Sequence, residues 1–158
     1  PVAVDIPAIL TLSKFVCPST SISPEMSNSV ELFIKHVETI RSNGFEIVHN
    51  ITKEDNQISI SFDDGWRGIY ENIELINTLR VPITIFIIPS FLDQENFLSK
   101  KELAEISKNT YVKIQSHTLN HFDLTSISVS ETLFHVERIM GLTKIDNEKI
   151  RLKLRFFQ

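Results

Sequence analysis

The sequence lacks three features that would place it in well-known protein classes: cysteine pairs, long apolar runs and an excess of basic residues. It contains one cysteine, Cys17, so it forms no intramolecular disulfide, and it has no cysteine cluster to hold a structural zinc ion. No apolar run approaches the roughly 20 residues that a helix needs to cross a bilayer. The formal net charge of -4 gives no support for a nucleic-acid-binding protein.

What the sequence does contain is typical of one ordinary globular domain. The 158 residues are enough to bury a core, and a charged fraction of 23% is usual for such a domain. The charges are mixed along the chain rather than gathered in blocks, which argues against a disordered acidic tail. We find no internal repeat, low-complexity tract or linker, and therefore expect a single domain over residues 1–158.

Short β-like runs alternate with segments of helical periodicity along the whole chain. Strands are predicted over 6–12, 45–48, 57–62, 82–88, 111–115 and 151–157. Helices are predicted from Ser23 to a stop at Gly44, from Gly65 through a stripe of Ile69, Ile73 and Ile76, and over 99–106 and 128–140. This alternation predicts an α/β fold with parallel strands, and it leaves open whether the sheet is open or closes into a barrel.

Two adjacent carboxylates and a glycine, Asp63-Asp64-Gly65, stand at the end of the strand predicted over 57–62. Side chains alternate in direction along a strand, so one aspartate can face a metal ion while the other faces a substrate. Gly65 allows the chain to turn sharply after the pair. Taken alone, however, the three residues are better explained as a solvated turn.

His117 and His121 follow another predicted strand and are separated by a spacing that lets two imidazoles converge on one ion. Two such histidines can equally be surface residues. Helical metalloproteases have a glutamate base where this chain has Thr118, so a metal site here must take its base from elsewhere. Parallel α/β folds gather function at the carboxyl ends of strands. Together, the histidines and one aspartate form a three-ligand set with open coordination positions, and the other aspartate can serve as the base.

The strings ISISFDDG and IQSHTLNHFDL resemble the first two signature motifs of the NodB-type polysaccharide deacetylase family, T/S-F-D-D-G and H-S/T-x-x-H. The segment ISPEMSNSVELFIKHVETIRSNGFEIV is similar to the helix and strand before the first motif, and VPITIFIIPSFL to the strand after it. The resemblance therefore covers nearly the whole chain. The fold that it implies is a partial or distorted (β/α) barrel with parallel strands and outer helices.

The resemblance also implies roles for individual residues. It implies that Asp63 is the general base. It implies that Asp64, His117 and His121 bind a divalent metal ion, with zinc as the expected ion. Thr118 resembles the position whose hydroxyl braces the loop between the histidines. The implied reaction is the metal-dependent hydrolysis of N-acetyl groups on an N-acetylglucosamine-containing glycan, with release of acetate.

Three further residues belong to the predicted site. Gly65 completes the first motif. Trp66 is a candidate for stacking on a sugar ring, although packing beside the motif is the more common explanation for such a residue. Arg155 is a candidate substrate-binding residue because it stands about where the Arg- and Pro-containing segment of the family begins, although no proline follows it. No histidine follows His135, which falls within a predicted helix, so the general acid is not identified.

These departures lead us to expect a deacetylase domain that is incomplete at its C-terminus, with weak or absent activity unless a partner supplies the rest. The alternative is an inactive remnant that binds metal or carbohydrate. A nuclease or phosphoesterase is less favoured, because only Arg67 stands close to the paired aspartates as a phosphate-binding candidate. The resemblance implies a glycan partner and a location in the cell envelope or outside the cell, although no signal peptide is seen. It implies nothing about the oligomeric state.

Overall fold

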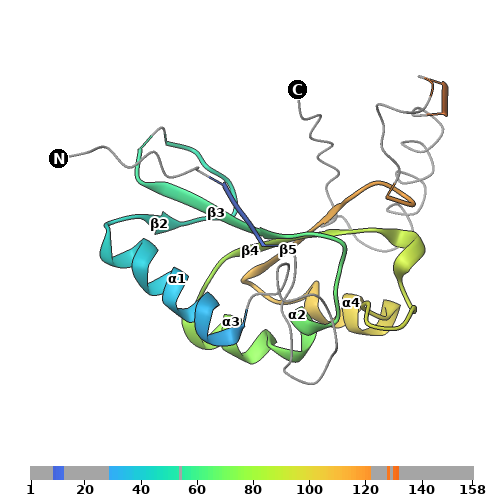
Figure 1. Cartoon of the computed structure of the whole chain (residues 1–158), viewed down its shortest axis with the longest axis horizontal. Coiled ribbons are helices and arrows are strands. Elements are labelled where there is room, and N and C mark those ends of the chain that lie inside the picture. Colours follow the sequence, from blue (N-terminus) through green and yellow to red (C-terminus); the bar gives the residue numbers. More distant parts are fainter. Residues whose placement is uncertain (1–8, 13–28, 54, 122–127, 129, 132–158) are drawn as a thin grey trace.

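A computed structural model describes residues 9–12, 29–53, 55–121, 128 and 130–131 of the chain (Figure 1). The elements in chain order are β1 (Ile9–Leu12), α1 (Val30–Ser42), β2 (Glu46–Ile47), β3 (Gln57–Phe62), α2 (Gly68–Glu71), α3 (Ile73–Leu79), β4 (Ile83–Ile87), the 3-10 helix η2 (Pro89–Phe91), α4 (Lys100–Ile106) and β5 (Val112–Ser116). None of the helices described here combines the length and the apolar character needed to cross a membrane.

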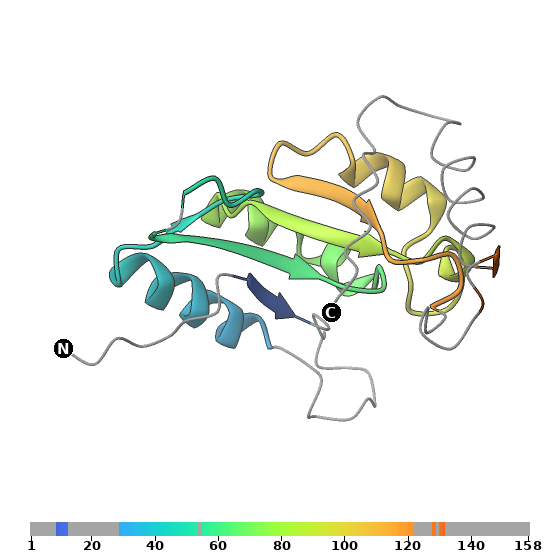
Figure 2. The same cartoon turned by 90° about the horizontal axis from the view of Figure 1, so that it is seen from above.

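The strands form one parallel sheet with the order β1-β3-β4-β5, and β2 pairs with the first residues of β3. The two views in Figures 1 and 2 show the helices α1 to α4 along the same side of this sheet. Helices along one face of a parallel sheet are typical of the wall of a (β/α) barrel, whereas a doubly wound sheet has helices on both faces. The predicted α/β class with parallel strands and outer helices is confirmed.

The inner strands β3 and β4 contribute six buried apolar side chains to the core. Ile60 and Ile85 are fully buried at the centre of the sheet, and only one residue in each of the two strands is not buried. Phe33 of α1 packs its ring against that of Phe62 at a centroid distance of 6.0 Å. Near-continuous burial is characteristic of a strand that is covered on both faces, which is what the apolar run at 82–88 predicts.

One predicted helix, the one after Gly65, differs from the structure within the described residues. Helix α1 begins at Val30, where the Ser29 side chain accepts a hydrogen bond from the backbone N–H of Leu32. The start predicted at Ser23 lies outside the described residues. The single helix predicted after Gly65 is instead two helices, because the chain leaves helical geometry at Asn72.

The break at Asn72 has a local cause. Its side-chain amide donates to the carbonyl oxygen of Gly68 at 2.8 Å, and its backbone has φ -110° and ψ 18°. Asparagine side chains compete in this way with the hydrogen bonds of a helix. The apolar stripe of Ile69, Ile73 and Ile76 nevertheless continues across the break, so both short helices keep their apolar face toward the sheet. The elements predicted at 151–157 and over most of 128–140 lie outside the described residues.

Candidate metal centre

The predicted site lies where three neighbouring parallel strands end. Asp63 and Asp64 directly follow β3, and His117 directly follows β5. Strand β4 lies between them, and its last residue, Ile87, accepts a hydrogen bond from the backbone N–H of His117 at 2.7 Å. The sheet ladder therefore extends to the first histidine and brings the two loops to one edge of the sheet.

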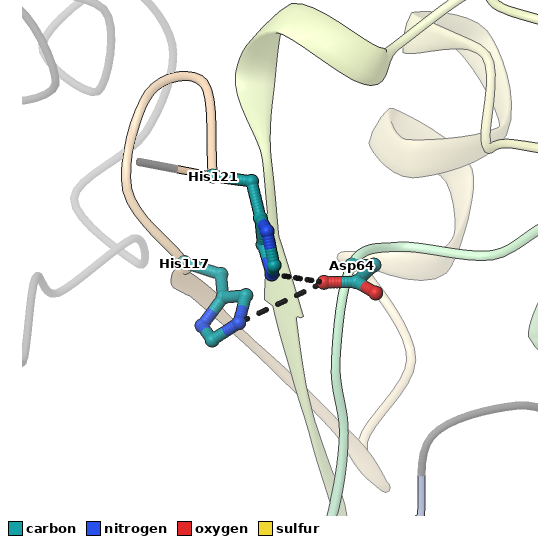
Figure 3. Close-up of side chains that lie close together, drawn as sticks. All are labelled: Asp64, His117 and His121. Carbon is teal, nitrogen blue, oxygen red and sulfur yellow. Dashed lines mark ion pairs between the residues drawn. The ribbon is translucent and has the colours of Figure 1, made fainter. Parts of the chain in front are cut away.

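At this edge, Asp64, His117 and His121 converge (Figure 3). The Oδ1 atom of Asp64 lies 3.4 Å from Nε2 of His121 and 3.7 Å from Nε2 of His117. One ligand atom from each of the three residues lies within 4.8 Å of the others. Two ligands bound at about 2 Å to one tetrahedral zinc ion are roughly 3.3 Å apart, so the spacing fits a shared cation.

The hydrogen bonding of Asp64 supports the same fit. Its Oδ1 atom is buried and has no hydrogen-bond partner in the part of the chain that the structure describes. A buried carboxylate oxygen without a partner is costly, and a cation bound between the two imidazoles would remove that cost. The side chain of His121 is 55% exposed, so the cluster is open to water and to a substrate on one side.

Backbone strain marks both loops of the site. Asp64 has φ 69°, Thr118 has φ 68° and His121 has φ 58°, all in the left-handed region. Such a conformation costs a residue with a side chain about 1–2 kcal/mol, and it persists only where the surroundings hold it. Strained backbone is often found at functional sites, which is consistent with the predicted role of this edge.

Gly65 is required by its conformation and by its neighbour. It has φ 78°, and a Cβ atom added to it would lie 3.2 Å from Cγ2 of Ile87. Only glycine combines the left-handed conformation with so close an approach to β4. Ile87 therefore contacts both loops of the site, the aspartate loop through its side chain and the histidine loop through its carbonyl oxygen.

The two adjacent aspartates have different surroundings. The three-residue cluster includes Asp64 but not Asp63. Burial raises the pKa of Asp63, and the neighbouring Asp64 carboxylate raises it further, whereas His117 and His121 act to lower it. The two carboxylates are thus distinguished by position, with one beside the imidazoles and one partly buried next to them.

Of two further predicted residues, Thr118 lacks the expected contact among the described residues and Trp66 packs beside the motif. The Oγ1 atom of Thr118 is buried and makes no hydrogen bond to the described residues, so the expected brace is not seen among them. Trp66 stacks its ring on Phe97 at a centroid distance of 4.3 Å, which covers one face of the indole. Phe97 in turn contacts Phe91 at 4.8 Å. Arg155 lies outside the described residues.

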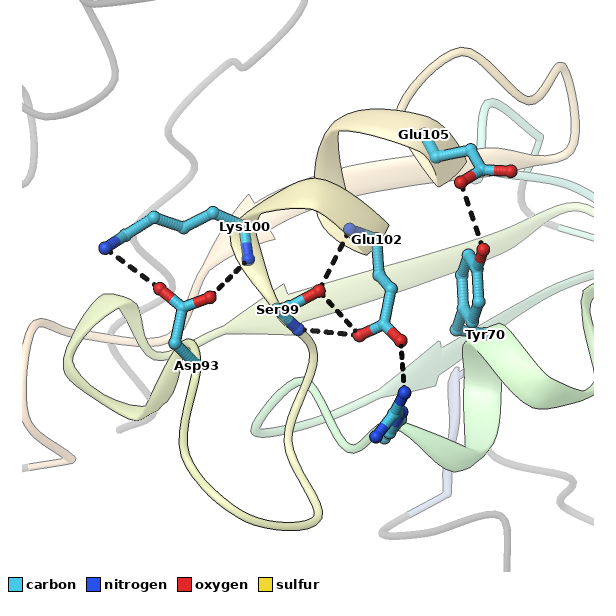
Figure 4. A network of polar contacts seen from close by, with 7 residues as sticks. Tyr70, Asp93, Ser99, Lys100, Glu102 and Glu105 are labelled. Carbon is cyan, nitrogen blue, oxygen red and sulfur yellow. Dashed lines mark hydrogen bonds and ion pairs between the residues drawn. The ribbon is translucent and has the colours of Figure 1, made fainter.

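A polar network beside the aspartate loop is centred on Glu102, which was not predicted to belong to the site (Figure 4). Nη2 of Arg67 lies 2.8 Å from Oε1 of Glu102. The other carboxylate oxygen of Glu102, Oε2, accepts hydrogen bonds from the backbone N–H and the hydroxyl of Ser99. Burial alone would raise the pKa of Glu102, but the two Ser99 donors and Arg67 outweigh it and hold the pKa below its usual value. The pattern Ser-x-x-Glu at 99–102 signals the capping box, but no sequence signal links it to Arg67.

Comparison with known proteins supports the resemblance seen in the motifs. The model of a family described as polysaccharide deacetylase matches residues 50–154, which is more than half of the chain. The chain belongs to the polysaccharide deacetylase family. A search of curated protein sequences finds no match.

Solved structures of polysaccharide deacetylases share the fold. IcaB from Ammonifex degensii is similar with a TM-score of 0.71 and 15% identity, over 95% of this chain and 75% of that chain. The Streptococcus pyogenes deacetylase PplD has a TM-score of 0.65 and 15% identity, over 82% of this chain and 63% of that one. BC0361, a polysaccharide deacetylase from Bacillus cereus, has a TM-score of 0.61 and 21% identity, over 84% of this chain and 46% of that one. The chain thus spans about half the length of BC0361.

Proposed function

We propose that this chain carries the cation-binding part of a polysaccharide N-deacetylase, a metal-dependent hydrolase that removes N-acetyl groups from a glycan and releases acetate. The proposal rests on the close approach of Asp64, His117 and His121. The Oδ1 atom of Asp64 lies close to both imidazoles and has no hydrogen-bond partner among the described residues. Membership of the polysaccharide deacetylase family supports the choice of reaction.

Each residue of the site has a proposed role. Asp64, His117 and His121 would hold a divalent cation, with zinc as the expected ion, and three protein ligands leave a position open for water or substrate. When bound, such an ion supplies Lewis-acid chemistry that polarises a carbonyl and makes water more acidic. Asp63 accepts the proton of the attacking water, because a partly buried carboxylate outside the ligand set is free to act as a base.

The proposed substrate is a glycan that contains N-acetylglucosamine. PplD, one of the structures that share the fold, was solved in complex with acetate, the product expected of this reaction. Trp66 has one ring face covered by Phe97, so its proposed contact with a sugar uses the other face or the ring edge. Arg67 is already paired with Glu102, which disfavours the phosphate-binding role that a nuclease would require. A cell-envelope or extracellular location remains a prediction.

Acetate release from N-acetylglucosamine oligomers, measured with and without added zinc, tests the proposal. We expect any release by the wild-type chain to be weak and zinc-dependent, and we expect none by Asp63→Asn or Asp64→Asn. The two variants separate the roles, because Asp63→Asn should keep the zinc affinity of the wild type whereas Asp64→Asn should lose it. Zinc binding without acetate release would instead support an inactive, metal-binding domain. Failure to bind zinc would contradict both.

A further inference from the structure

The loop that carries Asp64 is attached to a second segment, residues 93–99, which connects η2 to α4. The backbone N–H of Leu98 donates to the carbonyl oxygen of Gly65, and that of Arg67 donates to the carbonyl oxygen of Asn96, both at 2.9 Å. An antiparallel bridge between Trp66 and Phe97 lies between these two bonds. The residues after Asp64 are thus held along one side by a short ladder, although they belong to no regular strand.

The ion pair between Arg67 and Glu102 closes this ladder at its far end. The side chain of Glu102 is only 11% exposed, whereas that of Arg67 is 54% exposed. Glu102 is therefore the buried residue of the pair, and the Arg67 side chain contacts it from the surface. Glu102 is itself held by the Ser99 backbone N–H and hydroxyl at the start of α4, both at 2.8 Å. A link thus runs from the first turn of α4 to the aspartate loop.

The geometry of Asp64 makes this link important for the site. The backbone of Asp64 is left-handed, with φ 69°, which is unfavourable unless neighbouring contacts hold it. Its Oδ1 atom has no hydrogen bond to a described residue that could orient the carboxylate directly. The position from which the Asp64 side chain leaves the main chain is set by the backbone from Asp64 to Arg67, and the 93–99 segment holds that backbone through its bonds to Gly65 and Arg67.

We infer that Arg67 and Glu102 form a positioning pair that holds the aspartate loop in the conformation that presents Asp64 to the two histidines. The expected effect on zinc affinity rests on the proposed function. The expected effect on the loop backbone rests only on the contacts described above. Neither residue touches the cluster itself, so both act through the loop. Groups that hydrogen-bond directly to a metal ligand typically change metal affinity by about 10–100-fold when they are replaced, and we expect a pair that acts through the loop to fall near the lower end of that range.

A neighbouring pair on the same helices provides a matched control. The hydroxyl of Tyr70 in α2 donates to Oε2 of Glu105 in α4 at 3.0 Å (Figure 4), and neither residue is part of the ladder between residues 65–67 and 96–98. Glu105→Gln removes the same charge from the same helix as Glu102→Gln. A difference in zinc affinity between these two variants therefore reports on the contact with Arg67 and on the capping box. It does not report on a general effect of removing a charge from α4.

The experiment compares zinc affinity and backbone amide exchange in the full chain. The variants are Glu102→Gln, Arg67→Met, Arg67→Lys, the double variant of Glu102→Gln with Arg67→Met, and Glu105→Gln. We expect Glu102→Gln and Arg67→Met each to weaken zinc binding by about tenfold or more, and Arg67→Lys to retain most of the affinity. The double variant should bind zinc no more weakly than Glu102→Gln alone, because Glu102→Gln already removes the ion pair that Arg67→Met breaks. Glu105→Gln should match the wild type.

Amide exchange in the zinc-free protein provides a readout that needs no metal. The amides of Leu98 and Arg67 should exchange faster in Glu102→Gln and Arg67→Met, while amides in the centre of β4 keep their protection. Arg67→Met leaves the capping box of Ser99 and Glu102 in place, so it tests the inference even if Glu102→Gln fails to fold. Unchanged zinc affinity in Arg67→Met would overturn the inference. If the wild type binds no zinc, the proposed function fails, and unchanged exchange at Leu98 and Arg67 would then overturn the inference separately.

Discussion

Replacing Gly65 by alanine should destabilise the protein and disturb the site, and the structure allows the size of the effect to be worked out. Alanine at φ 78° loses about 1–2 kcal/mol relative to a relaxed backbone. The new Cβ atom also lies 3.2 Å from Cγ2 of Ile87, a buried β-branched side chain with little rotamer freedom. Overpacking of this kind costs about 1–3 kcal/mol, so we expect a total loss of about 2–5 kcal/mol in the free energy of unfolding.

Gly44→Ala is the matched control for this prediction. Gly44 has φ 82°, close to the value at Gly65, but no atom lies within 4 Å of an added Cβ. Gly44→Ala should therefore cost only the backbone term of about 1–2 kcal/mol. Urea unfolding followed by far-UV circular dichroism measures both variants without depending on Trp66, which adjoins Gly65. Equal losses in the two variants would refute the role assigned to the contact with Ile87.

Three further predictions concern the metal, the core and the pH dependence. Zinc at about 100 times its dissociation constant should raise the free energy of unfolding by about 2.7 kcal/mol in the wild type and not in Asp64→Asn, as measured by thermal unfolding with and without a chelator. Phe33→Ala removes a fully buried ring that packs on Phe62 and should cost about 3–5 kcal/mol in a urea titration, whereas Leu32→Ala, at an exposed position of the same helix, should cost far less. The pKa of Glu102 is held below its ordinary value of 4.5, so the stability that it contributes is present above that pH and is lost as the pH falls below it. The urea concentration at the unfolding midpoint should therefore fall less steeply between pH 6 and pH 3, roughly the range of carboxylate titration, in Glu102→Gln than in the wild type. The same dependence of the midpoint on pH in both proteins would contradict this account.

The sheet was largely predictable because its signals are local. The strand predicted over 57–62 is observed with the same bounds, and β4 lies within the apolar run at 82–88. The break at Asn72 was not predictable from periodicity, because the apolar stripe runs through it without interruption. The side-chain amide that ends α2 leaves no trace in the hydrophobic pattern.

The site was predictable in outline and not in detail. Parallel strands end at a common edge, so residues that follow β3 and β5 were expected to meet there. Alternation along a strand does not determine which aspartate faces the histidines, because Asp64 has left the extended conformation on which the alternation depends. The pairing of Arg67 with Glu102 joins distant parts of the chain through tertiary packing, and no pattern in the sequence links the two residues.

The shared contact with Ile87 has a consequence for how the protein tolerates insertions and deletions. Ile87 of the inner strand β4 positions both loops: its side chain packs against Gly65, and its carbonyl oxygen accepts a hydrogen bond from His117. Changes of length in the connections on the helical side can leave Ile87 in place. A single residue added within β4 would exchange inward and outward side chains and shift both loops at once, so the spacing of this strand should be the least variable length in the domain.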